Sequence, residues 1–160
     1  YRRNYDNDCS RRTRLYFEEF EVGQKMVSPG RTITESDVVG FAGLSGDFNL
    51  IHTDAEYAAN SPFGARVAHG LLGLSIASGL ALRTGVLEGT VMAFREIINW
   101  KFVKLMYLGD TIHVEMDIIT TKALKRLGGG KVELNFNVKN QNDETVMKGV
   151  WSVLVMGKPE

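Results

Sequence analysis

The chain has 160 residues, of which 44% are hydrophobic and 24% are charged, as in an ordinary soluble globular protein. Nineteen basic residues balance nineteen acidic ones, so no overall field attracts nucleic acid or an anionic membrane, and we expect neither as a partner. The apolar runs are too short for a transmembrane helix, nothing resembles a secretory signal, and the single Cys9 cannot form an internal disulfide, so we expect a cytoplasmic protein.

The N-terminal segment is polar and rich in arginine. Residues 1–14 contain five arginines and almost no aliphatic side chains, which predicts a polar arm. An alternative is that these arginines contact an anionic ligand or a neighbouring subunit. The pattern then becomes regular, and residues 15–160 are long enough to form one domain with a real core.

A short helix is the first regular element after an extended segment at residues 24–34. Thr34 followed three residues later by Asp37 approximates a capping box, which predicts the start of this helix. Its end is expected between Gly43 and Gly46, because glycines are typical of helix C-termini.

The chain is then expected to bend. Asp47 and His52 are five residues apart, and on a straight helix their side chains would point about 140° away from each other. Gly46 and Asn49 tolerate a turn, so the segment can bring the two side chains together. The Thr-x-x-Glu pattern of residues 53–56 is a second capping box, which predicts a helical turn directly after His52.

The rest of the chain predicts one helix followed by strands. Residues 69–85 are apolar nearly all round, which is typical of a buried helix, and their glycines and serines keep it slim enough for close packing. Alternating or apolar runs separated by turn residues then predict four antiparallel strands, at residues 90–104, 112–118, 132–138 and 145–156. We expect an α+β fold in which an antiparallel sheet wraps around this helix and buries its entire circumference.

Proton transfer is the chemistry that Asp47 and His52 favour. Their reference pKa values, about 3.9 and 6.5, place an ionised carboxylate beside a near-neutral imidazole at pH 7. Gly70, at the start of the buried helix, offers an unobstructed N–H at the positive end of the helix dipole, which suits a carbonyl oxygen that gains negative charge. The alternative is structural: an aspartate that caps a turn, a buried histidine and a glycine that only allows close packing.

A metal site is a second alternative. Asp47, His52 and His69 are suitable ligand types, but their spacing is not that of a characteristic metal motif and no cysteine assists them. We therefore expect no metal. His113 is expected at the surface, because it lies on the polar face of its strand beside Glu115.

Nucleophilic catalysis fits less well. Ser45 and Ser75 lack the Gly-x-Ser-x-Gly setting that exposes a nucleophile, and Cys9 lies in the polar arm, where nothing obvious holds it against a base. Acid–base chemistry is therefore the favoured interpretation.

The run SGDFNLIH, residues 45–52, resembles the signature of the MaoC-like, R-specific enoyl-CoA hydratase family (hydratase 2), which reads small residue, Gly-Asp-x-Asn-Pro, aliphatic residue, His. Leu50 stands where that signature has proline, and a small residue, Ala58, follows as the signature requires. The resemblance extends over residues 15–156 and includes the approaches at residues 17–23 and 31–37, the second block at 68–71, and the later segments at 100–102 and 109–110.

The resemblance implies a hot-dog fold and a homodimer that binds acyl-CoA near the subunit boundary. Asp47 and His52 would be the catalytic pair that activates water for addition to a trans-2-enoyl thioester, and the Gly70 N–H would polarise the thioester carbonyl. Asn49 would steady the catalytic loop and Ser78 would support the pair. No cofactor is implied beyond the coenzyme A that is part of the substrate.

Two other functions remain open. Some hot-dog proteins are thioesterases, which direct water to the thioester carbonyl rather than to C3. A non-catalytic acyl-CoA-binding module is the third possibility, because a fold does not fix a function.

Overall fold

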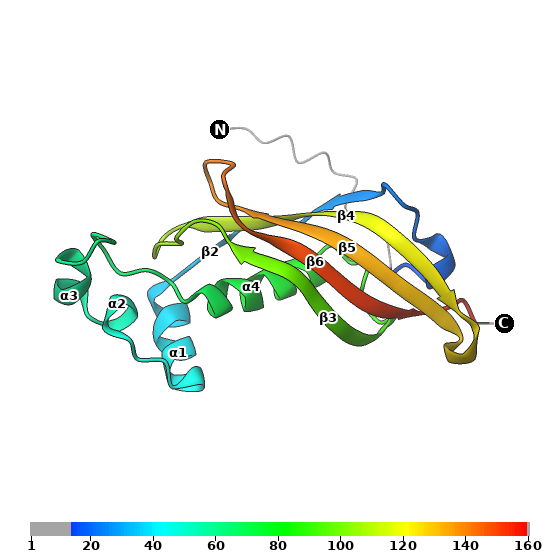
Figure 1. Cartoon of the computed structure of the whole chain (residues 1–160), viewed down its shortest axis with the longest axis horizontal. Helices are drawn as coiled ribbons and strands as arrows, with labels where there is room; N and C mark the ends of the chain where they lie inside the picture. Colours follow the sequence, from blue (N-terminus) through cyan, green and yellow to red (C-terminus); the bar gives the residue numbers. More distant parts are fainter. Residues whose placement is uncertain (1–13, 160) are drawn as a thin grey trace.

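The computed structural model describes residues 14–159, and its main layer is an antiparallel sheet of six strands (Figure 1). The strand order is β1-β4-β5-β6-β3, and β2 pairs with β4 outside this path. The predicted polar arm and Cys9 lie outside the described residues, apart from Arg14. The strands are β1 (Lys25–Val27), β2 (Arg31–Thr32), β3 (Val91–Phe102), β4 (Thr111–Leu124), β5 (Gly129–Lys139) and β6 (Thr145–Met156).

The central strands follow the alternation in the sequence. The inward side chains of β4 and β5 are fully buried, and their neighbours along each strand face outward and are more polar; the inward set is Ile112, Val114, Met116, Ile118, Val132, Leu134, Phe136 and Val138. The predicted strands are therefore confirmed. β6 has the predicted bounds and β3 is slightly shorter than predicted, whereas β4 and β5 are longer. β4 continues through residues 119–124, where alternation has stopped but pairing with β5 persists.

The long helix α4 (Gly70–Leu82) lies against the concave face of the sheet (Figure 1). Leu72, Ile76 and Leu80 are buried in the core. The expected close packing is present at Gly73, where an added Cβ would lie only 2.2 Å from Cε of Met106.

The sheet covers only one side of α4. Leu71, on the other side, is 60% exposed, and Leu82 is also exposed. The expectation that the sheet buries the whole circumference is therefore wrong for one chain by itself, because the sheet curls over the helix without closing around it. The uncovered side lies next to the edge strand β3, which presents the exposed apolar side chains Met92, Phe94 and Ile97.

Three short helices project beyond one end of the sheet (Figure 1): α1 (Glu35–Ser45), α2 (Leu50–Thr53) and α3 (Ala55–Ala59). Two single-turn 3-10 helices complete the described structure, η2 (Phe17–Glu19) and η3 (Lys125–Leu127). None of the helices in residues 14–159 combines the length and apolarity that crossing a bilayer requires.

One predicted cap is wrong. Asp54, not Thr53, caps α3, and its carboxylate accepts a hydrogen bond from the Tyr57 N–H at 2.9 Å. Thr53 is the last residue of α2, and its hydroxyl bonds back to the carbonyls of Phe48 and Asn49, at 3.2 and 3.3 Å. A threonine hydroxyl inside a helix commonly bonds to a preceding carbonyl, which leaves it unable to cap the next helix.

The capping box of α1 predicts a pH-dependent contribution to stability. Burial alone would raise the pKa of Asp37, but the N–H and hydroxyl of Thr34 and the guanidinium of Arg31 outweigh this effect and hold that pKa below its usual value. A carboxyl group whose pKa is lower in the folded state than in the unfolded state stabilises the fold at pH values above its usual pKa. This stabilisation is lost as the pH falls through the folded pKa.

Asp37→Asn should therefore lower the free energy of unfolding by about 0.5–2 kcal/mol at pH 7, and the difference from wild type should shrink below pH 4. Urea unfolding at a series of pH values measures this, with Glu21→Gln as the control, because Glu21 has no ion pair among the described residues and should show little difference at any pH. A difference for Asp37→Asn that does not change with pH would contradict the assignment.

Candidate active site

The loop after α1 changes direction at Gly46 and presents Asp47. Gly46 ends α1 with a φ of 78°, a left-handed conformation that favours glycine. The Asp47 N–H donates to the Ser45 hydroxyl at 3.2 Å, and the Asp47 carboxylate accepts from the Asn49 N–H at 3.2 Å. Asn49 then caps α2 by accepting from the Ile51 N–H at 3.3 Å. The predicted bend is confirmed, and Asn49 lies where it can order the loop.

His52 lies in α2 with one ring nitrogen committed to the backbone. Its side chain is 7% exposed, and Nδ1 lies 2.7 Å from the carbonyl oxygen of Val67. A carbonyl only accepts, so Nδ1 carries the hydrogen and the neutral ring keeps a lone pair on Nε2. This tautomer is the one that lets Nε2 take a proton from water.

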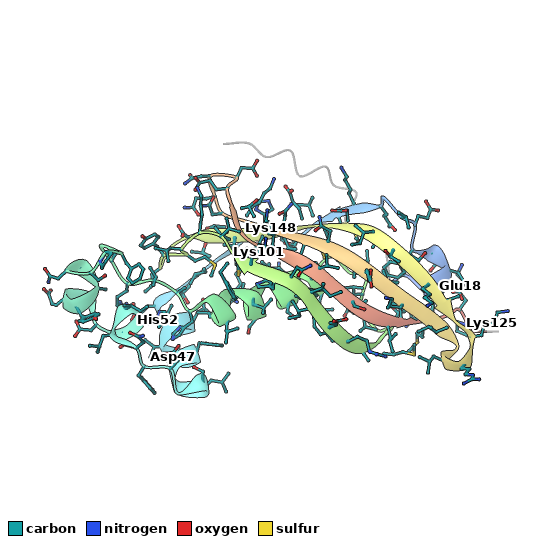
Figure 2. The ribbon with its side chains drawn as sticks, in the orientation of Figure 1. Glu18, Asp47, His52, Lys101, Lys125 and Lys148 are labelled. Atoms are coloured by element: carbon teal, nitrogen blue, oxygen red, sulfur yellow. The ribbon has the colours of Figure 1, made fainter. Side chains whose placement is uncertain are left out.

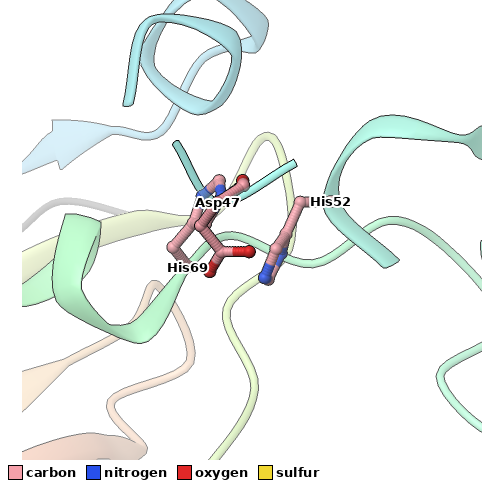
Figure 3. Close-up of side chains that lie close together, drawn as sticks. All are labelled: Asp47, His52 and His69. Carbon is pink, nitrogen blue, oxygen red and sulfur yellow. The ribbon is translucent and has the colours of Figure 1, made fainter. Parts of the chain in front are cut away.

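The carboxylate of Asp47 points towards the ring of His52 (Figure 3). One of its oxygens lies within 4.8 Å of a ring nitrogen of His52 and of a ring nitrogen of His69. Figure 2 places Asp47 and His52 together at the end of the molecule that carries α1 and α2, far from the β4–β5 turn marked by Lys125. Asp47 is exposed, so a small molecule can reach the pair from solvent.

His69 contacts both Asp47 and His52, which the sequence did not predict. Its ring stacks on that of His52, with centroids 3.8 Å apart and an interplanar angle of 28°. Its Nε2 lies 2.9 Å from the backbone carbonyl oxygen of Asp47, while its buried Nδ1 has no hydrogen-bond partner among the described residues. The sequence carries a signal for this role, because His69 stands directly before Gly70 in the second block of the family pattern, whereas its residue type alone suggests only a metal ligand.

Gly70 is the first residue of α4, so its N–H has no partner within the helix. This N–H lies at the positive end of a helix of 13 residues. The ring of Phe102 packs on the Cα of Gly70, and an added Cβ would lie 2.9 Å from Cε1 of that ring. The start of α4 thus combines an available N–H with an apolar neighbour.

The segment 67–70 joins the two parts of the site. The Val67 N–H donates to the carbonyl of Ile51 at 3.1 Å, and the Val67 carbonyl accepts from His52. The Ala68 N–H donates to the carbonyl of Met106 at 2.7 Å, which fixes the segment to the loop before β4. Asp47, His52, His69 and Gly70 are therefore brought together.

Ser78 lies elsewhere on α4. It is eight residues beyond Gly70, about 12 Å along the helix. It lines a hollow of about 310 Å³ between α4 and β3, together with Leu74, Ser75, Phe94, Ile97 and Trp151. Its supporting role stays a prediction.

The geometry of the two histidines does not favour a metal ion. The nitrogens free to bind are His52 Nε2 and His69 Nδ1, since the other nitrogen of each ring faces a backbone carbonyl. Lone pairs lie in the ring planes, and stacked rings direct them side by side rather than towards a common point. The residues therefore fit proton transfer better than coordination.

A second group of possible ligands lies on the outer face of the sheet: His113, Glu115 and Asp143. The ammonium of Lys139 lies among them, 3.0 Å from Glu115 and 3.5 Å from Asp143, and its hydrogen bond to Glu115 raises the pKa of Lys139. The ammonium group of Lys139 therefore already supplies positive charge where a metal ion would have to bind. The expectation that His113 is a surface residue is wrong, because its side chain is buried beside Glu115.

Solved structures share this arrangement of sheet and helix. The monoamine oxidase regulatory protein from Archaeoglobus fulgidus is 34% identical with a TM-score of 0.82, and the match covers 92% of this chain and 98% of that one. The R-hydratase PhaJ1 from Pseudomonas aeruginosa is 31% identical with a TM-score of 0.74, covering 89% and 86% of the two chains. A Mycobacterium tuberculosis protein described as a double hotdog fold matches with a TM-score of 0.78 at 19% identity, covering 91% of this chain and 45% of that one. The fold is the hot-dog fold, as predicted.

Sequence comparison defines the family. The MaoC like domain matches residues 18–140, and the chain belongs to this family of MaoC-like dehydratase domains. The protein MaoC of Klebsiella aerogenes is 44% identical over 103 residues, and the 3-hydroxybutyryl-CoA dehydratase of Methylorubrum extorquens is 36% identical over 104 residues. These matches cover 64% and 65% of this chain but only 30% and 64% of the relatives, so the chain spans less than two thirds of either relative's length.

Leu50 occupies a position that suits the proline of the family signature. It is the first residue of α2, where proline is favoured, and Asn49 before it has φ −53° and ψ 136°, which a following proline allows. Leu50→Pro should therefore raise the free energy of unfolding by about 0.4–1 kcal/mol, because the unfolded chain loses freedom. Thermal and urea unfolding measure this, with Leu44→Pro, inside α1, as a destabilising control. A loss of stability in Leu50→Pro would show that the N–H of Leu50 or its side chain matters to the bend.

Proposed function

We propose that this protein catalyses the reversible, (R)-specific hydration of trans-2-enoyl-CoA to 3-hydroxyacyl-CoA. The observation that carries the proposal is the Asp47 carboxylate facing His52, whose Nε2 is free because Nδ1 donates to the Val67 carbonyl. The N–H of Gly70, which has no partner within α4, directly follows His69 in the same site. The names of two relatives described above, 3-hydroxybutyryl-CoA dehydratase and R-hydratase PhaJ1, support the same reaction class.

The proposed chemistry uses each group once per turnover. Asp47 and His52 hold a water molecule between them, and one of them takes a proton from it as the water oxygen bonds to C3 of the substrate. Electron density moves to the thioester oxygen, where the Gly70 N–H and the dipole of α4 stabilise the enolate. A proton from the pair then reaches C2, on the same face as the new hydroxyl, which gives syn addition.

The hollow between α4 and β3 is the proposed site of the acyl chain. Its lining is mainly apolar, and it starts about one helical turn beyond Gly70, at Leu74. A thioester carbonyl at Gly70 would direct the chain along α4 towards Ser78. We propose Ser78 as a supporting residue in this hollow, where its hydroxyl faces the substrate.

Crotonyl-CoA tests the reaction directly. The full chain is incubated with crotonyl-CoA, and enoyl absorbance and free thiol are followed together. Loss of absorbance without thiol release is expected. Release of thiol would instead indicate a thioesterase, and absence of both signals, also with longer enoyl-CoA substrates, would indicate an acyl-CoA-binding module.

We also propose that two copies form a homodimer that covers the apolar surface of α4 and β3. A long edge strand with exposed apolar side chains favours pairing with another chain. A second copy laid on this surface would cover Leu71 of α4 and Phe94 of β3, and would close the open side of the hollow.

Charge substitutions on this surface should dissociate the dimer. We expect sedimentation equilibrium to give twice the mass of the chain for wild type, and the double variant Leu71→Glu/Phe94→Glu to weaken association at least about 100-fold, because four charges would be buried without partners. Val22→Glu is the matched control, since Val22 is similarly exposed but precedes β1 at the opposite edge of the sheet. A monomeric wild type, or a double variant that remains dimeric, would contradict this proposal.

A further inference from the structure

His69 contacts both members of the catalytic pair from outside the loop that carries them. It lies 22 residues beyond Asp47 in the sequence, donates from Nε2 to the Asp47 carbonyl at 2.9 Å, and stacks on His52 with 3.8 Å between ring centroids. Its side chain is 3% exposed, and the ring of Phe41 packs against it with centroids 5.0 Å apart. It is held firmly enough to position other groups.

The hydrogen bond from His69 has no equivalent elsewhere in the Asp47 loop. The other hydrogen bonds of residues 46–49 connect positions no more than five residues apart, between Ala42 and Thr53. Among the described residues, His69 therefore provides the one long-range hydrogen bond to this exposed loop.

The imidazole of His69 provides a hydrogen-bond donor and a stacking ring at the same time. A carbonyl only accepts, so Nε2 of His69 carries the hydrogen, and Nδ1 is left buried without a partner. If only the stacking surface mattered, phenylalanine would supply it without an unpaired polar atom. If only the donor mattered, glutamine would supply it without the ring. Histidine is the residue that provides both together.

Residues 67–69 thus hold both proton-handling groups from one side. The Val67 carbonyl fixes the ring of His52 through Nδ1, and His69 fixes the backbone of Asp47 through Nε2. Displacement of a reacting group by about 1 Å is enough to reduce turnover about 100-fold.

We propose that His69 is a positioning residue for the Asp47–His52 pair, acting through its hydrogen bond to the Asp47 carbonyl and its stacking on His52. The inference rests on the proposed function of that pair. His69 is not assigned a proton-transfer step, and its effect is on where the Asp47 carboxylate meets His52.

Two substitutions separate the donor from the ring. His69→Phe keeps a stacking ring and removes the donor, whereas His69→Gln keeps an N–H donor near the position of Nε2 and removes the ring. With crotonyl-CoA, we expect kcat of His69→Phe to fall about 10- to 100-fold, KM to stay within about threefold, and His69→Gln to recover at least part of the loss. A His69→Phe variant with wild-type kcat would overturn the proposal. Equal losses of kcat in His69→Phe and His69→Gln, each accounted for by a smaller fraction of folded protein, would also overturn the proposal.

Amide hydrogen exchange provides a readout that does not depend on activity. We expect the amides of residues 47–49 to exchange at least about tenfold faster in His69→Phe than in wild type, and to return towards wild type in His69→Gln. Unchanged exchange in His69→Phe would overturn the positioning role, whatever the activity. Faster exchange in a protein whose wild type does not hydrate crotonyl-CoA would retain the positioning role and reject the proposed function. Should His69→Phe not fold, His69→Leu replaces it as the variant without a donor.

Discussion

Asp47→Asn and His52→Ala are each expected to lower kcat for the hydration of crotonyl-CoA by roughly 10²–10⁴-fold, the usual contribution of a positioned acid or base. Asp47→Asn keeps the shape of the side chain and its contact with the Asn49 N–H, but removes the negative charge that faces His52. His52→Ala removes the free Nε2 and leaves the Val67 carbonyl without its donor. Initial rates at saturating substrate measure both effects, and circular dichroism checks that the fold is retained.

The pair should also behave as one unit. If Asp47 and His52 hold the same water, the double variant should be no slower than the slower single variant, because the second substitution removes an interaction that is already lost. Asp54→Asn is the matched control: it removes a carboxylate two residues from His52 that caps α3 through the Tyr57 N–H, a role that asparagine can also fill, so its kcat should stay within about threefold of wild type. Retained activity in Asp47→Asn or His52→Ala would exclude that residue from proton transfer.

Gly70→Pro is the second substitution with a large expected effect. Loss of one oxyanion donor typically costs about 10²–10³ in kcat, and proline removes the N–H that would bond the thioester oxygen. The position accepts proline for two reasons: it is the first residue of α4, and His69 before it has φ −59° and ψ 136°, which a following proline allows. The N–H can therefore be removed while α4 is retained.

Gly70→Ala is the control that isolates the N–H. Both variants add a Cβ that lies 2.9 Å from Cε1 of Phe102, and both must displace that half-exposed ring, but alanine keeps the N–H. We expect kcat of Gly70→Pro to fall at least about tenfold below that of Gly70→Ala. Equal rates for the two variants, with α4 intact by circular dichroism, would show that the Gly70 N–H does not bind the developing oxyanion.

The sheet could be predicted from the sequence because its signal is local. The inward residues Ile112 to Ile118 alternate with polar neighbours, and a strand facing one core must show that period. This alternation identifies which face of the strand points to the core, but not which side chains cover the other face. The burial of His113 beside Lys139 and Asp143 could therefore not be predicted. For the same reason the uncovered side of α4 could not be predicted, since Leu71 looks like any other core leucine in the sequence.

The site was predictable to the extent that its residues are neighbours in the chain. The bend from Gly46 to His52 follows from turn-forming residues and from the capping side chain of Asn49. His69 was missed because its stacking on His52 depends on how α2 lies against residues 67–69, a contact that no local pattern encodes. The cap of α3 was predicted at Thr53, one residue before Asp54, because the Thr-x-x-Glu pattern does not show that the Thr53 hydroxyl bonds to preceding carbonyls once α2 has formed.

The segment that runs from Val67 to Gly70 has a consequence for how the site responds to motion. Its first residue supplies the carbonyl that orients His52, and its last residue supplies the N–H proposed for the oxyanion. Only three planar peptide units separate these two groups, and the dihedral angles between the units are restrained by the hydrogen bonds from the Val67 N–H to Ile51 and from the Ala68 N–H to Met106. We therefore expect the distance between the Val67 carbonyl and the Gly70 N–H to vary little when the sheet moves. The Asp47 loop is joined to this segment through the side chain of His69, so its position depends on a single hydrogen bond and a ring contact.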